Sequence, residues 1–143
     1  MLMKLIINYM RGCNMIVNGL NISIKLDNKI YVTKYNSSVG KTFLLNMLKS
    51  YDARPENEGK LLLITYDKKQ SIENILSMIR EFKGIFILLD RFDLYYDISI
   101  VQALTEKNIP VLLDLKNYKR FNEFSAGLAK LTIFKDKIEV IGL

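Results

Sequence analysis

The pattern of hydrophobic and polar residues near the start of the chain predicts a pair of strands. Residues 20–26 alternate between the two kinds, which places on one face Leu20, Ile22, Ile24 and Leu26. A period of two is typical of a strand with one buried face. Asp27-Asn28 fits a two-residue turn because both residues tolerate a left-handed backbone. We therefore expect residues 29–33 to return as an antiparallel partner of 20–26. Residues 2–8 and 15–18 are shorter candidate strands.

Continuous hydrophobic runs in the middle of the chain predict strands that are buried on both faces. Residues 61–66 form one such run, and residues 84–90 read GIFILLD, in which five apolar residues are closed by an aspartate. Residues 111–113 form a third run directly after Pro110, a residue that a strand tolerates at its start.

Hydrophobic residues at helical spacing predict helices between these strands. The stretch after position 42 has one apolar face, Ser71 is a suitable N-cap for a second helix, and Asp97 caps a third that ends near Asn108. A short helix is also expected over residues 121–128. The inward-facing residues of the first three helices are Phe43, Leu44, Met47 and Leu48; Ile72, Ile75, Leu76 and Ile79; and Ile98, Val101 and Leu104.

Strands that alternate with helices are typical of an α/β fold with a parallel-centred sheet. A second hairpin is predicted near the C-terminus, where residues 131–134 and 137–141 flank a turn at Lys135-Asp136. The first is the hairpin predicted over residues 20–33. We therefore predict a three-layer α/β fold whose central sheet is mostly parallel, with antiparallel hairpins at its N- and C-terminal ends.

Length and composition favour one globular domain. The 143 residues, half of them hydrophobic, suffice for a single core, so we expect one domain over 1–143 with residues 1–14 as a peripheral extension. The first ten residues are too short to span a bilayer and lack a secretory cleavage site. A single cysteine, Cys13, fits a reducing cytoplasm. Because the chain has no histidine, Ser-His and Cys-His nucleophile pairs and imidazole zinc sites are excluded.

The eight residues YNSSVGKT, positions 35–42, carry the clearest candidate chemistry. They lie between a predicted strand and a predicted helix, which is the layout of a phosphate-binding loop. Backbone N–H groups of such a loop point at one anion, and the helix dipole adds positive charge there. Lys41 would reach the outer phosphates, and the Thr42 hydroxyl would take one position on Mg²⁺. The alternative interpretation is an ordinary turn with an exposed lysine.

A second motif lies where the predicted 84–90 strand ends. Asp90 closes this buried run, and a side chain at the carboxyl end of a parallel strand projects to the edge where ligands bind in open α/β sheets. An aspartate at this position can hold Mg²⁺ directly or through water. The alternative is a polar residue that merely ends a strand.

Together the two motifs resemble the P-loop NTPase superfamily, as a Walker A-like YNSSVGKT and a Walker B-like GIFILLD. The resemblance implies a three-layer P-loop fold and a nucleoside triphosphate site with ATP and Mg²⁺ as ligands. Lys41 would contact the phosphates, and Thr42 and Asp90 would bind the metal. The backbone amides of the cradle would come from Ser37, Ser38, Val39, Gly40, Lys41 and Thr42.

The sequence also departs from the superfamily pattern in several places. Tyr35 occupies the position of the first P-loop glycine, which normally permits a tight turn. Arg91 follows Asp90 where many ATPases place a water-activating glutamate, and the guanine-reading and switch motifs of GTPases are absent. Adenine is therefore the expected base, and hydrolysis is expected to be slow or absent.

Three charged residues are candidates for the missing catalytic part. Asp93, three residues after Asp90, is assigned to the catalytic set with Lys41 and Asp90 because it could position a water; the alternative is a carboxylate at a helix start. Asp114 ends the next strand, where related ATPases keep a polar group that senses the γ-phosphate. Arg91 could stabilise phosphoryl charge in a neighbouring subunit, or form a surface ion pair.

Net charge and chain length leave two functional classes open. The charge of +6 favours an anionic partner, yet the basic residues are scattered and no nucleic-acid-binding signature is present. The first hypothesis is a small cytoplasmic protein that binds Mg-ATP, with an impaired site for hydrolysis. The alternative is a non-enzymatic module that keeps the P-loop fold and binds a protein or a nucleic acid, for example as an accessory protein of a mobile element or phage.

Overall fold

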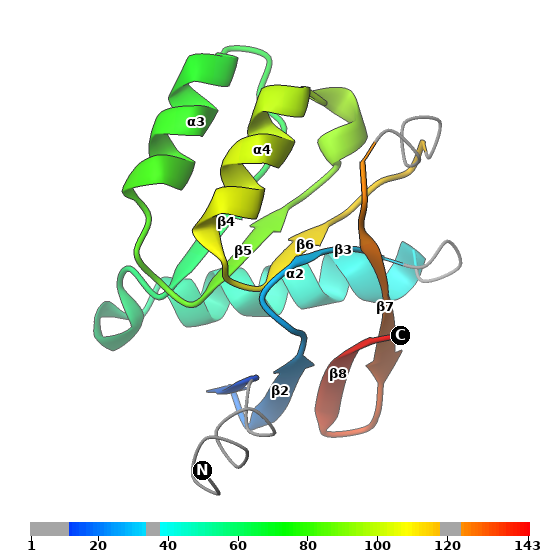
Figure 1. Ribbon diagram of the computed structural model, residues 1–143. Helices are drawn as coiled ribbons and strands as arrows, with labels where there is room; N and C mark the ends of the chain where they lie inside the picture. The colour runs from blue at the N-terminus through cyan, green and yellow to red at the C-terminus, as the bar shows by residue number, and fades with distance from the viewer. Residues whose placement is uncertain (1–11, 34–37, 118–123) are drawn as a thin grey trace, which may run out of the picture.

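The computed structural model describes residues 12–33, 38–117 and 124–143, and these form an α/β fold with a curled, mixed sheet of eight strands and three α-helices (Figure 1). The strands are β1 Cys13–Val17, β2 Leu20–Lys25, β3 Ile30–Thr33, β4 Leu61–Ile64, β5 Phe86–Leu89, β6 Val111–Leu113, β7 Gly127–Ile133 and β8 Lys137–Gly142. The helices are α2 Ser38–Asp52, α3 Ile72–Glu81 and α4 Ile98–Lys107, with 3-10 turns η1 Pro55–Asn57 and η2 Phe92–Leu94.

The strand order across the sheet is β1-β2-β8-β7-β3-β6-β5-β4. From β7 to β4 each neighbouring pair is parallel, and β2 and β8 are parallel as well. The β1–β2 and β7–β8 pairs are antiparallel. The α/β class is confirmed, but a mostly parallel sheet is too simple a description, because the sheet as a whole is mixed.

The predicted hairpin between residues 20–26 and 29–33 is wrong. β2 pairs with β1 and β8, whereas β3 pairs with β6 and β7. The antiparallel hairpin at this end is instead β1–β2, joined by Asn18 and Gly19, whose φ angles are 51° and 78°. Two successive left-handed residues give a tight hairpin turn the twist that its strands require, and Asn-Gly is the sequence that adopts it most readily.

Three of the residues predicted to face inward from the helices are instead exposed: Phe43, Ile72 and Ile98.

The predicted helix caps and the C-terminal hairpin are confirmed. Ser71 caps α3 by accepting a hydrogen bond from the Asn74 backbone N–H, and Asp97 caps α4 in the same way from Ser99. α4 ends at a left-handed Asn108. The C-terminal hairpin forms between β7 and β8.

The helix predicted over residues 121–128 is not present in the part that the structure describes. Residues 124–126 are irregular and β7 begins at Gly127. Residues 121–123 lie outside the described ranges, as do the candidate strand 2–8 and the segment 34–37. Of the predicted peripheral extension 1–14, residues 13 and 14 belong to β1.

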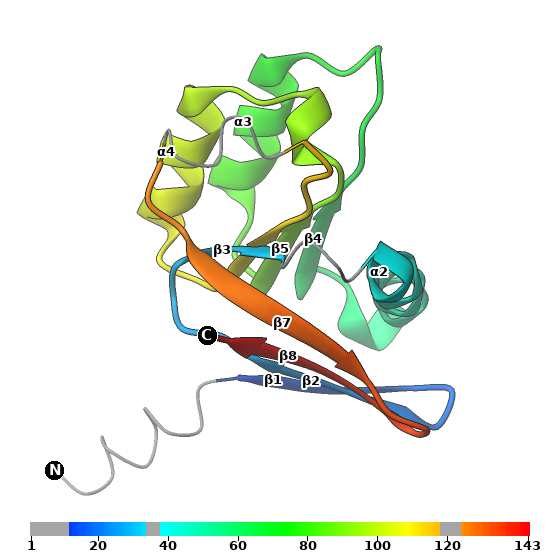
Figure 2. The same ribbon diagram turned by 90° about the vertical axis from the view of Figure 1, so that its right-hand side faces the viewer.

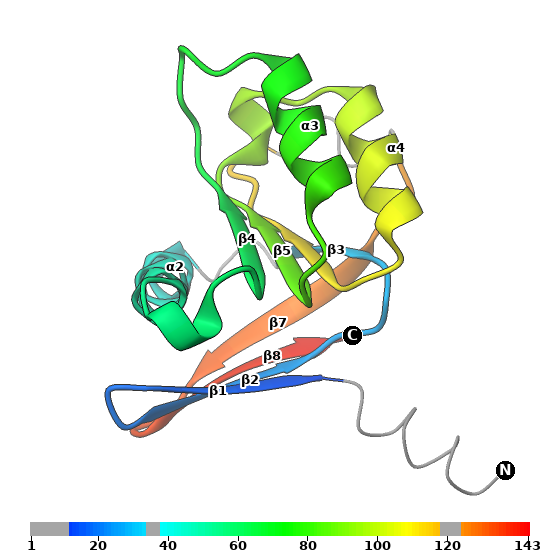
Figure 3. The same ribbon diagram turned by 90° about the vertical axis from the view of Figure 1, so that its left-hand side faces the viewer.

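Helices cover both faces of the β3–β6–β5–β4 part of the sheet (Figure 2). α2 packs on one face through Leu44 and Leu48, with Tyr31 and Leu88 among its sheet partners. α3 and α4 pack on the other face, against a second core formed by the alternate strand residues, such as Val32 and Leu89. The remaining strands curl round α2, which contacts both β1 and β7 (Figure 3).

After the neighbouring strands β3 and β6, the chain continues on opposite faces of the sheet. α2 follows β3 on one face, while Leu115, which follows β6, packs in the core of the other face beside Phe124. Because β3 and β6 are parallel neighbours, their carboxyl ends lie at the same edge of the sheet, and the elements that follow them lie on opposite faces. Ligands of open α/β sheets bind at such switch points.

No helix in the described ranges combines the length and the apolar character that crossing a membrane requires.

Candidate functional site

The segment predicted to form the anion cradle is helical earlier than expected. α2 begins at Ser38, so Ser38, Val39, Gly40, Lys41 and Thr42 all lie in its first turns. Ser37 and Tyr35 fall outside the described residues. The first four N–H groups of an α-helix have no partner within the helix. The backbone N–H groups that the sequence assigned to a loop are therefore presented largely by a helix terminus.

Gly40 also has a packing role that the sequence did not reveal. A Cβ atom built at this position would lie 2.8 Å from Leu131 Cδ2 and 3.2 Å from Ile133 Cδ1. The glycine therefore lets α2 approach β7 closely. These contacts are to side-chain ends, which can shift, so a glycine favours this helix–sheet packing without being required for it.

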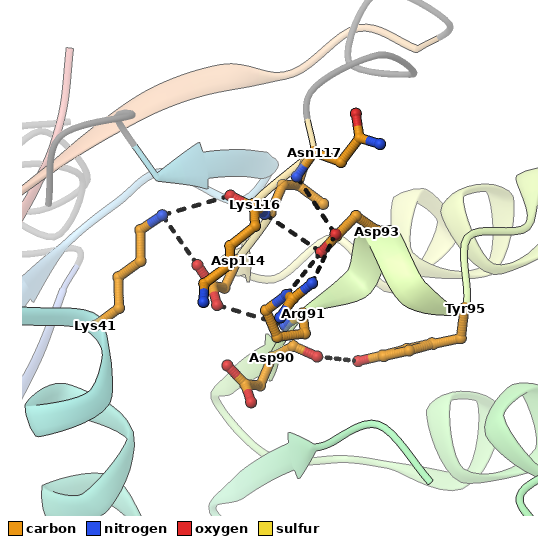
Figure 4. Close-up of polar contacts among 9 residues, drawn as sticks. Lys41, Asp90, Arg91, Asp93, Tyr95, Asp114, Lys116 and Asn117 are labelled. Atoms are coloured by element: carbon orange, nitrogen blue, oxygen red, sulfur yellow. Dashed lines mark hydrogen bonds and ion pairs between the residues drawn. The ribbon is translucent and has the colours of Figure 1, made fainter. Parts of the chain in front are cut away.

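Lys41 points from α2 to the carboxyl end of β6 (Figure 4). Its Nζ atom lies 3.0 Å from Asp114 Oδ1 and 3.5 Å from the Leu115 carbonyl oxygen. The side chains of Lys41 and Asp114 are only 12% and 11% exposed. The pair is thus largely withdrawn from water, where the interaction of two charges is weakly screened.

Asp90 and Asp114 occupy equivalent places at the ends of neighbouring strands. The Asp90 N–H donates to the Ile64 carbonyl of β4, and the Asp114 N–H donates to the Leu89 carbonyl of β5. The sheet ladder therefore fixes both residues at the same edge. Lys41, Asp90 and Asp114, together with Thr33, line one small cavity. The structure thus brings together Lys41 and Asp90, which the sequence paired.

The two carboxyl groups affect each other's protonation. The pKa of Asp90 is raised to about 6, first by burial and then by the hydrogen bond to Asp114 and the negative charge of Asp114. The charges of Lys49 and Arg91 oppose this shift. Two carboxylates in one site favour retention of a proton. Asp90 therefore ionises fully only above neutral pH.

We expect Asp90→Asn to stabilise the protein at pH 7.5. The raised pKa means that the folded state binds more protons than the unfolded chain between about pH 4 and 6, so stability falls as pH rises through this interval. An asparagine removes that penalty and can donate an N–H to Asp114. Because Asp90 is partly exposed, screening limits the gain to about 1 kcal/mol, or about 2–4 °C in Tm for a domain of this size.

The pH dependence of the melting temperature checks this prediction. The difference between Asp90→Asn and the parent protein should be largest at pH 7.5 and should vanish near pH 4. Asp136→Asn, at an exposed position in the β7–β8 turn, is the matched control. A variant that melts lower than the parent at pH 7.5 would show that the Asp90 carboxylate is stabilising.

Asp93, assigned to the catalytic set from the sequence, is fully engaged within the protein. Its Oδ1 accepts from Arg91 Nε and the Lys116 N–H, and its Oδ2 accepts from Arg91 Nη2 and the Asn117 N–H. Burial alone would raise the pKa of Asp93, but these hydrogen bonds and the Arg91 charge outweigh it and lower the pKa. The geometry favours a structural role, in which Asp93 ties η2 to the segment after β6.

Arg91 adopts a left-handed backbone conformation, with φ of 51°. This conformation is uncommon for residues other than glycine and concentrates at functional sites. It directs the Arg91 N–H toward Asp114 Oδ2, at 3.4 Å, while the guanidinium group binds Asp93. The side chain is therefore held within its own molecule and is not extended toward a neighbour.

The two predicted metal ligands are placed differently. Asp90 faces the cavity with Lys41, but Thr42 is exposed and is not among the described residues that line this cavity. Within the described ranges, no group of three or more acidic, Cys or His residues could hold a metal ion. A metal at this site would therefore rely on Asp90 or Asp114 and on ligand or water oxygens, as Mg²⁺ commonly does.

Tyr95 is a site residue that the sequence analysis missed. Its hydroxyl donates a hydrogen bond to the Asp90 carbonyl oxygen at 2.8 Å and lies 3.3 Å from the Ile64 carbonyl oxygen. It thereby holds the chain where β4 and β5 end. Burial, followed by the nearby aspartates, raises its pKa, so the phenol stays protonated. No sequence pattern marks this contact, because Tyr95 meets Ile64 only through the fold.

No protein-family model, curated protein or solved structure matches this chain.

Proposed function

We propose that the chain is a P-loop-type nucleotide-binding protein that binds Mg-ATP through Lys41 and hydrolyses it slowly or not at all. The observation that carries this proposal is the convergence of Lys41, Asp90 and Asp114 beside the amino end of α2. This is the combination of positive and negative groups that a metal–polyphosphate complex requires.

The anion-binding half of the site consists of Lys41 and the start of α2. Unpartnered backbone N–H groups and the helix dipole both favour a negative group at a helix amino end. Lys41 lies in that first part of the helix and brings a full positive charge, held away from bulk water. A triphosphate supplies several adjacent anionic oxygens, so it can engage the lysine and the helix end together.

The cation-binding half of the site is the carboxyl pair. Asp90 and Asp114 offer hard oxygen donors, which suit Mg²⁺, and Mg²⁺ usually takes only one or two protein carboxylates when phosphates complete its shell. When bound, Mg²⁺ would supply charge neutralisation between these carboxylates and the phosphates. Ionisation of Asp90 above its raised pKa prepares the site for a cation. Metal-dependent nucleotide affinity should accordingly rise between pH 5.5 and 7.5.

Slow turnover follows from the surroundings of the site. Arg91 takes the position at which a water-activating glutamate would follow Asp90, and its guanidinium is bound by Asp93. Both Asp93 oxygens already accept two hydrogen bonds each, so this carboxylate is poorly suited to orient an attacking water. Positioning and charge alone should support binding better than hydrolysis.

A thermal-shift panel tests the proposal directly. ATP, GTP and their non-hydrolysable analogues are added with and without Mg²⁺ to the full chain. A ligand at about 100 times its Kd stabilises the folded state by about 2.7 kcal/mol, which corresponds to roughly 5–10 °C. We expect such a shift with Mg-ATP and a smaller one without metal. No shift with any nucleotide would refute the proposal.

Measurement of phosphate release separates the two functional classes. A thermal shift with no phosphate released identifies a nucleotide-dependent module, while steady release identifies an ATPase. The Lys41→Ala variant described in the Discussion is the control, because any release that persists in it comes from a contaminant.

A further inference from the structure

A second, larger cavity opens at the same edge of the sheet. Its volume is about 420 Å³, which falls in the range of small-molecule sites. Its walls are Leu94, Tyr95, Tyr96, Leu115 and Phe124, from η2, the following turn, and both ends of the connection after β6. We call this cavity the aromatic pocket. Its lining is mainly aromatic and aliphatic, as is typical of pockets that bind small organic molecules.

The aromatic rings of the pocket are held in place by one another. Tyr96 and Phe124 are stacked, with centroids 6.0 Å apart and planes inclined by 23°. The fully buried Phe92 lies behind them, 5.5 Å from Tyr96 and 5.4 Å from Tyr95. Rings fixed in this way lose little further freedom when a ligand binds, which reduces the entropic cost of binding one.

Two polar residues, Asp93 and Asn117, complete the lining of the pocket. The oxygen atoms of Asp93 are taken up by Arg91 and two backbone N–H groups. Asn117 is exposed, and its backbone is fixed by the bond from its N–H to Asp93.

We propose that the aromatic pocket binds a planar heteroaromatic ring, specifically a nucleobase. Stacking on tyrosine and phenylalanine faces suits any base, because every base has a π-face. This inference stands on the pocket alone and holds whether or not Lys41 binds phosphates.

The base could arrive from two sources, which the geometry relates closely. The Leu115 carbonyl oxygen lies 3.5 Å from Lys41 Nζ, while Leu115 also lines the aromatic pocket. Leu115 therefore lies between the aromatic pocket and Lys41 and contacts both. The base belongs either to the nucleotide whose phosphates meet Lys41 or to a separate nucleoside.

The test is an NMR titration of the full chain with adenosine, guanosine, cytidine and uridine. We expect saturable binding of at least one nucleoside. Leu94→Arg places a charge at the mouth of the pocket, and since Leu94 is 47% exposed the fold should tolerate it. This variant should weaken nucleoside binding by about tenfold or more. Ile98→Arg is the matched control, because Ile98 is also 47% exposed but lies outside the pocket lining, and it should change affinity by less than about twofold.

Titrations with ATP and with inorganic tripolyphosphate distinguish the two sources. If Leu94→Arg weakens ATP binding but leaves tripolyphosphate binding unchanged, the base comes from the nucleotide at Lys41. If adenosine and ATP bind together without competing, the base comes from a separate molecule. The inference is overturned if no nucleoside and no nucleotide perturbs the protein, or if Leu94→Arg binds every one of them as the parent does. If the parent protein binds a nucleoside but does not bind ATP, only the proposed function is refuted.

Discussion

Lys41→Ala should abolish the binding of Mg-ATP, with a loss of affinity of about 100-fold or more in calorimetry. The Lys41 ammonium is the charged group at the start of α2, and it is only 12% exposed. Charge-assisted contacts to phosphate oxygens are the strongest single interactions that such a site can make. Unchanged affinity for Mg-ATP would remove Lys41 from the site and with it the proposed function.

A loss of ATP binding in Lys41→Ala has to be distinguished from a loss of stability. Removing Lys41 leaves Asp114 with an uncompensated, largely buried charge, which costs about 3 kcal/mol or more. The double variant Lys41→Met, Asp114→Asn removes both charges and should recover most of that stability while still failing to bind. Lys83→Ala is the matched surface control, since Lys83 is exposed and precedes β5 at the opposite edge of the sheet. It should bind Mg-ATP as the parent protein does.

Asp93→Ala should destabilise the fold by about 2–4 kcal/mol, which lowers Tm by roughly 5–15 °C. The Asp93 side chain is only 7% exposed and accepts four hydrogen bonds, two from Arg91 and two from backbone N–H groups. The substitution leaves these donors without their acceptor in a partly buried place. Urea unfolding of the variant and the parent at pH 7 measures the difference.

Acid pH supplies an internal control for this variant. The pKa of Asp93 is lowered by folding, so its stabilising effect is present above the pKa of the unfolded chain and is lost as pH falls through the lower pKa of the folded state. The gap between variant and parent should therefore narrow in acid. Asp67→Ala is the matched comparison, because Asp67 is an exposed loop residue whose carboxylate accepts from the Lys69 N–H. Equal stability of Asp93→Ala and the parent at pH 7 would contradict the structural role.

The sequence predicted local features well, since these depend on neighbouring residues. The caps at Ser71 and Asp97 act within three residues of themselves, and the hydrophobic run that ends at Asp90 is buried on both faces of the sheet. Period and capping are properties of short segments, so they can be recognised without the rest of the fold.

Pairing between distant segments was where prediction failed. The turn at Asp27-Asn28 suggested that β2 and β3 were partners, but two other strands lie between them in the sheet. The Asn18-Gly19 turn, a stronger hairpin signal, was the one that formed. Burial favours the observed pairing, because β2 and β8, a strand more than 100 residues away, bury apolar residues in the same core as α2.

In the candidate site, too, some contacts could be predicted from the sequence and others could not. Lys41 and Asp90 could be placed near each other because strand ends and helix starts meet at one edge of a parallel sheet. The structural role of Asp93 could not be foreseen, because it depends on the N–H groups of Lys116 and Asn117 in a distant segment. The aromatic pocket likewise joins Tyr95 and Phe124, which no sequence spacing connects.

The ion pair between Lys41 and Asp114 gives the site an internal competitor for an incoming ligand. Any incoming anion has to share the ammonium with a carboxylate that is already 3.0 Å away and cannot diffuse off. A weakly charged anion gains little from that exchange, whereas a polyphosphate that brings its own cation gives the displaced carboxylate a new partner. The pair therefore sets a charge threshold, which should exclude free phosphate and monophosphates and admit metal-bound triphosphates.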